Sequence, residues 1–239
     1  MVSGALSCPS EPGATGGDPV PDTRQRLLEA AIHVFGCSGF DGASTRSIAR
    51  QAGANVQSIA YYFGNKAGLY RAAAETVGQE IAGLTGPLRV RIRDRLEACS
   101  ASAGPMSREE ATQHLHELAV FLVRLILSPQ AESWARFIVR EQMGPSEAFH
   151  DLYQRVMGPI LDVVSRLVAI LLEEPDPGAP SVRLRTLAFA GSVLVFRFGQ
   201  ATVLRQTGWQ SIQDKEMDAV CAMLRTLVES LRPAGDRTL

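Results

Sequence analysis

The sequence predicts an all-α fold, and three observations support this prediction. Aromatic residues make up only 6% of the 239 residues. Few segments alternate between apolar and polar residues with the period of two that marks a strand. From residue 23 onward, apolar residues instead recur three and four positions apart, as they do on one face of a helix. The length suits one compact unit or two small domains.

The N-terminal part is predicted to hold a disordered leader followed by an amphipathic helix. Residues 1–21 are rich in Gly, Pro, Ser and Ala and show no apolar periodicity. The helix is expected from Thr23 to Ser38. Asp22 or Thr23 can cap its free amides, and Gly39 weakens its end.

Two short helices separated by a tight turn are predicted next. The first begins at Ser44 or Thr45, either of which is a good N-cap, and ends near Ala52. The turn is formed by residues 53–55, and the second short helix covers residues 56–63. This arrangement is typical of a helix-turn-helix, in which the first helix braces the second in the DNA major groove. The alternative is a small helical hairpin without a DNA-binding role.

The second short helix has one apolar face. Val56, Ile59 and Phe63 share that face and are expected to pack against the brace. The other positions carry polar tips or a small side chain, which suit contact with bases or phosphates in a groove. These positions are Gln57, Ser58, Ala60, Tyr61 and Tyr62. The alternative for the two tyrosines is that they are ordinary core aromatics.

The remainder of the chain is also predicted to be helical. Asn65 can cap a fourth helix that begins near Lys66 and carries apolar residues as far as Ile81. The pair Gly158-Pro159 predicts a kink inside an otherwise continuous pattern. The further helices are expected at residues 88–100, 108–127, 129–143, 146–172, 181–206 and 211–231.

Basic residues concentrate near the N-terminus. The formal net charge of the chain is −1, yet residues 21–72 hold six basic residues against three acidic ones. A locally basic head on a neutral-to-acidic body fits a DNA-contacting module joined to a module that does not contact DNA.

The N-terminal segment has the parts of a known family in the same order. They are an amphipathic helix, an aromatic-Gly loop, the brace, the turn and a closing aromatic motif. The segment Arg26–Tyr70 closely resembles the N-terminal domain of TetR-type transcriptional regulators and reads RLLEAAIHVFGCSGFDGASTRSIARQAGANVQSIAYYFGNKAGLY.

This resemblance implies a homodimer that binds a double-stranded DNA operator. It implies phosphate contacts from Thr45 and Arg46 at the start of the brace, where the helix dipole assists. It also implies contacts from Tyr61 and Tyr62 to backbone or bases, and a phosphate clamp at Lys66. Many members of the family carry an aromatic residue where this chain has Ala60, which indicates a different operator preference.

A second segment, Arg136–Leu172, resembles the C-terminal domain of a CerR/CecR-like subgroup of that family. The resemblance implies control of transport or drug-efflux genes and a small, partly apolar effector. The matching features are Arg140-Glu141, Pro145, Phe149, Tyr153 and Pro159.

Large apolar side chains and arginines of the C-terminal helices can line an effector pocket. The alternative is that the aromatics are plain core and the charges are solvated. Arg197 interrupts an apolar run, which makes it a candidate for a buried ion pair, a pocket residue or an interface residue. The ligand-binding candidates are Trp134, Phe137, Arg140, Met143, Phe149, Tyr153 and Arg197.

We therefore predict two domains and a regulatory function. Residues 22–70 form the helix-turn-helix DNA-binding domain. Residues 71–239 bind the effector and dimerise. In the resembled family, the last two helices form the dimer interface. The predicted function is a ligand-responsive transcriptional regulator, a repressor that binds a palindromic operator and is released by a small molecule. The alternative is a helical protein-interaction module that does not bind DNA.

Several other classes are disfavoured. The sequence has no Gly-rich phosphate loop, HExxH or GxSxG motif, so we expect no enzyme and no cofactor. No cysteine pair has the spacing of a zinc knuckle, and we expect no metal site. No apolar run reaches membrane-spanning length and no secretory signal is visible, so we expect a cytoplasmic protein without a membrane partner.

Overall fold

The computed structural model describes residues 22–98 and 104–233, and within these ranges it contains helices and no strand. The all-α prediction is confirmed. The predicted leader, residues 1–21, lies outside the described residues. The helices are α1 (Thr23–Gly42), α2 (Thr45–Gln51), α3 (Gln57–Phe63), α4 (Lys66–Ala98), α5 (Arg108–Leu127), α6 (Ala131–Met143), α7 (Glu147–Leu152), the π-helical turn η1 (Tyr153–Met157), α8 (Gly158–Leu172), α9 (Pro180–Phe198), α10 (Gln200–Thr207) and α11 (Asp214–Glu229).

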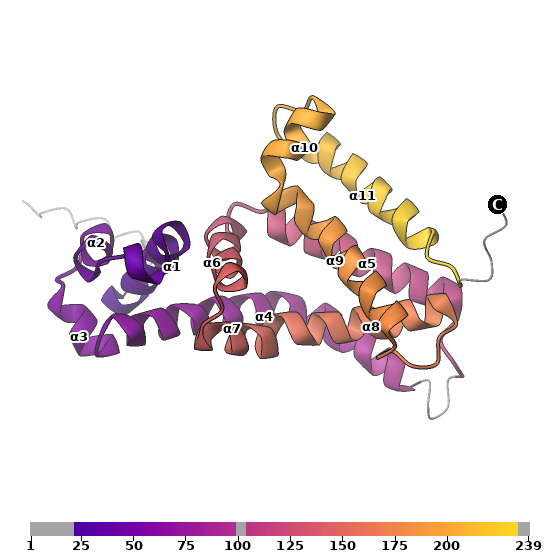
Figure 1. Ribbon diagram of the computed structural model, residues 1–239, viewed down its shortest axis with the longest axis horizontal. Coiled ribbons are helices and arrows are strands. Elements are labelled where there is room, and N and C mark those ends of the chain that lie inside the picture. The colour runs from indigo at the N-terminus through magenta and orange to yellow at the C-terminus, as the bar shows by residue number, and fades with distance from the viewer. Residues whose placement is uncertain (1–21, 99–103, 234–239) are drawn as a thin grey trace, which may run out of the picture.

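The molecule is elongated, and α4 runs along much of its length (Figure 1). Helices α1 to α3 form one end, and α5, α8, α9 and α11 gather towards the other (Figure 1). Two clusters of buried apolar side chains correspond to these ends. The first unites α1 to α4 with α6 and α7, and the second unites the later part of α4 with α5, α8, α9 and α11. Helix α6 therefore packs with the N-terminal helices although it follows α5 in sequence.

Helix α4 is continuous through Pro87, whereas the sequence predicted separate helices on either side of it. A proline in a helix removes one amide donor, and its ring meets the carbonyl of the residue four positions earlier. Here that residue is Gly83. A Cβ atom at Gly83 or at Gly86 would have no neighbour within 4 Å, so no other element packs on α4 at these two positions.

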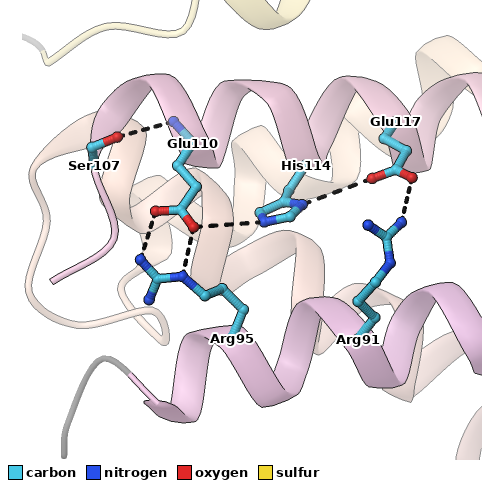
Figure 2. A network of polar contacts seen from close by, with 6 residues as sticks. All are labelled: Arg91, Arg95, Ser107, Glu110, His114 and Glu117. Carbon is cyan, nitrogen blue, oxygen red and sulfur yellow. Dashed lines mark hydrogen bonds and ion pairs between the residues drawn. The ribbon is translucent and has the colours of Figure 1, made fainter. Parts of the chain in front are cut away.

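The later part of α4 is fastened to α5 by a network of charged side chains (Figure 2). The guanidinium of Arg95 donates to both carboxylate oxygens of Glu110, from Nε at 2.6 Å and from Nη2 at 2.7 Å. Arg91 also pairs with Glu117 across the two helices, through one contact from Nη2 to Oε1. The ring of His114 lies between the two carboxylates, 4.0 Å from Glu110 and 3.8 Å from Glu117. The network fixes the orientation of α5 relative to α4.

The predicted kink near Gly158-Pro159 is a π-helical turn that ends just before it. The amide of Gly158 donates to the carbonyl of Tyr153, five residues earlier, which defines the wider turn. A Cβ atom at Gly158 would lie 3.1 Å from that carbonyl oxygen, so the close approach favours glycine. The pattern at residues 146–172 thus covers α7, the π turn and α8 rather than one kinked helix.

The helix predicted at residues 181–206 is also divided. Helices α9 and α10 meet at Gly199 with a bend of 83°. A Cβ atom at Gly199 would lie 3.0 Å from the carbonyl oxygen of Val195, so glycine allows the chain to turn closely against the preceding helix. Periodicity alone missed this break because apolar residues continue on both sides of it.

Within residues 22–98 and 104–233, no single helix is long and apolar enough to cross a bilayer. Taken together, the bent pair α9 and α10 is long and apolar enough to cross a bilayer, by length and composition alone.

The turn between α3 and α4 gives a stability prediction. A Cβ atom at Gly68 would lie 2.0 Å from the backbone oxygen of Phe63, which cannot move aside without distorting α3. We expect Gly68→Ala to lower the free energy of unfolding by about 1–3 kcal/mol. The control is Gly83→Ala, because that position has open space and helical backbone. The control should be neutral or stabilise by about 0.5–1 kcal/mol. Equal urea midpoints for the two variants would contradict this account.

Candidate nucleic-acid interface and apolar cavity

The brace and the turn have the geometry of a helix-turn-helix. The Ser44 hydroxyl accepts the amide of Ser47 at 3.0 Å, so Ser44 is the N-cap of α2. The turn passes through Gly53 at φ 59°, in the left-handed region that favours glycine. Asn55 Oδ1 then accepts the amide of Gln57 at 2.9 Å and starts α3.

Helix α3 buries one residue and exposes most of the others. Ile59 is buried against the N-terminal core. Tyr61 is 82% exposed and packs edge-on against the exposed Tyr62, with ring centroids 4.8 Å apart. The reading of these tyrosines as core aromatics is therefore wrong. Val56 is exposed as well, contrary to the predicted packing, because it precedes the first turn of α3 and lies outside the packed face.

The remaining candidate DNA-contacting residues, on α2 and α3, lie at or near the surface. Gln57 and Ala60 are exposed and Ser58 is half-buried on α3. Thr45 is half-buried and Arg46 exposed in the first turn of α2. The structure thus brings the candidates of both short helices to one end of the molecule (Figure 1).

Lys66 stands at the start of α4, beside the aromatic-Gly loop. Its Nζ atom lies 4.5 Å from the ring centroid of Phe40 and 3.5 Å from the carbonyl oxygen of Asp41. Asn65 caps α4 as predicted, since its Oδ1 accepts the amide of Gly68 at 2.9 Å. The ammonium group is therefore held near α3 by neutral partners, and no carboxylate of residues 22–98 or 104–233 forms an ion pair with it.

Tyr70 of α4 contacts both α1 and α6. Its ring packs edge-on against Phe35 of α1, with centroids 4.8 Å apart, and lies 5.0 Å from the ring of Phe137 of α6. Its hydroxyl donates to the carboxylate of Glu141, also on α6. Burial, together with the neighbouring Glu141, raises the pKa of Tyr70, so the phenol stays protonated.

Glu141 is only 2% exposed and needs hydrogen-bond donors for its carboxylate. Tyr70 supplies one on Oε1. Ser146, which begins α7, supplies two more on Oε2, from its amide at 3.1 Å and from its hydroxyl at 2.9 Å. This one carboxylate therefore ties together α4, α6 and α7. We refer to Tyr70, Glu141 and Ser146 as the carboxylate junction.

An apolar cavity of about 410 Å³ lies on the other side of α6. Its walls come from α4, α5, α6, the π turn, α8 and α9. The residues from α6 are Ala131, Trp134, Ala135, Ile138 and Gln142. No charged side chain of the described residues lines it, and Gln142 contributes the only side-chain amide among them. The cavity has the size and the lining of a small-molecule site.

Of the seven ligand-binding candidates, the structure places Trp134 in the wall of this cavity. Phe137 is buried in the N-terminal cluster, to which Trp134 also belongs, but it does not line the cavity. Met143, Phe149 and Tyr153 are at least partly exposed, and Met143 is 84% exposed. These four residues do not line the cavity.

The two arginine candidates bind backbone oxygens near it. Arg140 of α6 donates to the carbonyl of Cys37 in α1 at 2.8 Å. Arg197 of α9 donates to the carbonyls of Ile126 and Ser128 at the C-terminal end of α5, at 2.7 and 2.8 Å. The partners of Arg197 are therefore neutral carbonyls rather than a carboxylate, and the charge complements the end of a helix.

Sequence reasoning missed both the carboxylate junction and the cavity walls. Glu141 has the polar neighbour Gln142 and reads as a solvated residue on a helix. Tyr70 and Glu141 are 71 residues apart, so no local pattern connects them. The only indication of Glu141 in the sequence was the pair Arg140-Glu141, one of the features that match the CecR-like C-terminal domain.

Both parts of the chain match known families. Residues 27–73 match the family described as bacterial regulatory proteins, tetR family. Residues 109–234 match the C-terminal domain of the HTH-type transcriptional dual regulator CecR. The dual regulator CecR of Shigella flexneri is 31% identical over 198 residues, which cover 82% of this chain and 85% of that protein.

Solved structures share the fold at low identity. AmtR of Mycobacterium smegmatis is 18% identical with a TM-score of 0.56, and the match covers 88% of each chain. FadR of Bacillus subtilis, solved in complex with stearoyl-CoA, is 17% identical with a TM-score of 0.53. That match covers 86% of this chain and 97% of FadR.

The carboxylate junction gives a pH-dependent prediction. Tyr70→Phe removes a donor from the buried Glu141 carboxylate, so we expect the free energy of unfolding to fall by about 1–3 kcal/mol at pH 7. The pKa of Tyr70 is raised in the folded protein, so the stability due to its hydroxyl is present below pH ~10 and is lost as the pH rises beyond it.

Urea titrations of the original chain and the Tyr70→Phe variant between pH 7 and 11 measure this difference. The gap between the two should narrow above pH ~10. A constant gap across the whole range would contradict the role of the phenol.

Proposed function

Because the chain belongs to the TetR family of bacterial regulators, with a C-terminal domain of the CecR type, we propose that it is a repressor released by a small molecule. It binds a palindromic operator as a homodimer and controls transport or efflux genes. Residues 22–70 read the DNA, and residues 71–239 bind the effector and dimerise. The observation that carries the proposal is α6, which packs against the N-terminal helices and also lines the apolar cavity, with Trp134 taking part in both.

The exposed side of α3 supports the DNA-reading role. A soluble helix normally buries large aromatic side chains, and Tyr61 instead projects into solvent from a helix that follows a tight glycine turn. Gln57, in the first turn of α3, offers an amide that can pair with a base edge. In a helix-turn-helix the early residues of the second helix face the bases. Lys66 adds a cation at the edge of this surface.

The position of α6 supports the response to an effector. A molecule in the cavity touches Trp134 and Ile138, one turn apart on α6. Phe137, which lies between these two residues on α6, packs against Tyr70 at the start of α4. A shift of α6 is thereby passed to the helix that carries Lys66. An effector releases DNA in this way only if it binds the shifted arrangement more tightly than the operator-bound one.

The outer face of α9 supports the homodimer. It presents an apolar stripe at helical spacing that the described residues of the chain leave uncovered, with Leu184 68% exposed. Gly191 lies within the stripe, and a Cβ atom there would meet nothing, which allows a second helix to approach closely. TetR-family regulators usually bind DNA as dimers. The stripe consists of Leu184, Leu187, Leu194, Val195 and Phe198.

Binding to the chain's own upstream promoter fragment tests the proposal directly. Fluorescence anisotropy at several salt concentrations should show tight binding with a steep negative salt dependence, because phosphate contacts release counterions. In vitro transcription from the same fragment should fall when the protein is added. Absence of salt-dependent binding at low ionic strength would favour a helical protein-interaction module instead.

Two substitutions at the DNA-binding end separate phosphate from base contacts. Lys66→Ala should weaken binding by a similar factor on all operator sequences and reduce the salt slope by about 1. Gln57→Ala should instead cost about 1–3 kcal/mol at particular base pairs and relax sequence preference there. Competition with a set of single-base operator variants distinguishes the two patterns. A loss confined to one base pair in Lys66→Ala would contradict its assignment to phosphate.

The dimer face gives a further prediction. Leu184→Glu places a charge in the exposed stripe of α9, so we expect sedimentation to show monomers and operator affinity to fall at least tenfold. Leu84→Glu is the matched control, since Leu84 is an exposed leucine of α4 outside the stripe. The control should remain dimeric and bind DNA normally. A Leu184→Glu protein that stays dimeric would rule out this face.

A further inference from the structure

A second hollow lies next to the apolar cavity and carries a positive charge. It is a groove of about 350 Å³ between α1, α6 and the bend from α9 to α10. Three arginines line it, Arg136, Arg140 and Arg197, against one carboxylate, that of Glu132. We call it the arginine groove. Gly36 of α1 also lines it, so the groove borders the N-terminal helices directly.

The arginine groove and the cavity are adjacent and share two lining residues. Ala135 of α6 and Phe198 of α9 line both of them. Ala135 is small, and Phe198 is about half exposed at the end of α9, next to the bend at Gly199. An elongated molecule can therefore pass from the apolar cavity into the arginine groove if the ring of Phe198 turns aside.

We propose that the effector is an anionic amphiphile, with its apolar body in the cavity and its negatively charged head on Arg136 and Arg140 of the arginine groove. This inference rests on the proposed function, because it names the chemical class of the effector. The cavity alone offers no charged partner among the described residues, so a charge buried there would be costly. The adjoining guanidinium groups accommodate a carboxylate or a similar anion at little such cost.

The present partners of the two α6 arginines connect the site to DNA binding. Arg136 lies 3.2 Å from the Cys37 sulfur and 2.6 Å from Glu132, and Arg140 donates to the Cys37 carbonyl at 2.8 Å. Cys37 belongs to α1, which packs closely on α6. Hydrogen bonds of an arginine to an anion are stronger than those to a thiol or a carbonyl. An anionic head in the groove thus competes for the contacts that hold α6 to α1.

A series of dodecyl compounds that differ only in head group tests this inference on the full chain. The uncharged dye N-phenyl-1-naphthylamine serves as the probe. Dodecanoate and dodecylammonium compete with it below their micelle concentrations, and dodecanol competes with it below its solubility limit. We expect dodecanoate to displace the probe at a concentration at least about tenfold lower than dodecanol, with dodecylammonium weakest. We also expect dodecanoate to release operator DNA.

Two variants assign the head group and the body. Arg136→Gln should weaken the binding of dodecanoate about tenfold and leave the binding of dodecanol unchanged. The control is Arg205→Gln, at an exposed arginine of α10 outside the groove, and it should change the binding of neither compound. The chain has two tryptophans, so in Trp209→Phe the remaining Trp134 reports from the cavity wall. Its fluorescence should change when dodecanoate binds.

The outcomes separate this inference from the proposed function. If dodecanol or dodecylammonium binds as well as dodecanoate, or if Arg136→Gln leaves dodecanoate binding unchanged, the anionic head is wrong. The same holds if none of the three compounds binds. In each case salt-dependent operator binding can still be intact, and then the proposed function stands. Failure of operator binding itself would instead remove the proposed function.

Discussion

The carboxylate of Glu141 constrains much of the molecule. It is nearly fully buried, and a buried charge is tolerated only when donors surround it. Those donors come from Tyr70 on α4 and Ser146 at the start of α7, so α6 can satisfy them in only a narrow range of orientations. With α6 set in this way, one of its sides meets the aromatic rings near α1. The other side is left to form part of the cavity wall.

The N-terminal helices were predictable because their signals are local. Ser44 and Asn65 cap helices within three residues of themselves, and Gly53 permits a left-handed turn that few other residues adopt. Such interactions join residues that are close together in the sequence. The exposure of Tyr61 depends in contrast on what the rest of the chain leaves uncovered. Sequence alone therefore left open whether this ring belonged to the core.

The cavity was not predictable residue by residue. Its walls are drawn from six elements, and each wall residue looks like any other apolar residue on its own helix. Trp134 and Phe137 illustrate the difficulty, because they are three positions apart and both buried in the N-terminal cluster, yet of the two only Trp134 also lines the cavity. Deciding between them requires knowing which helices flank α6. The break at Gly199 was hidden for a related reason, since apolar residues continue across it, whereas the pair Gly158-Pro159 indicated a kink but not its π-helical form.

The π-helical turn at Tyr153–Met157 has a consequence for the phase of the helices on either side of it. Each residue advances an α-helix by about 100°. The turn takes up one residue more than α-geometry would, so the apolar faces of α7 and α8 are offset by roughly that rotation. Leu152 can then point into the N-terminal cluster while Val163 and Val164 point into the C-terminal one. If the same residues formed one uninterrupted α-helix, one of these faces would be rotated away from its cluster and towards water.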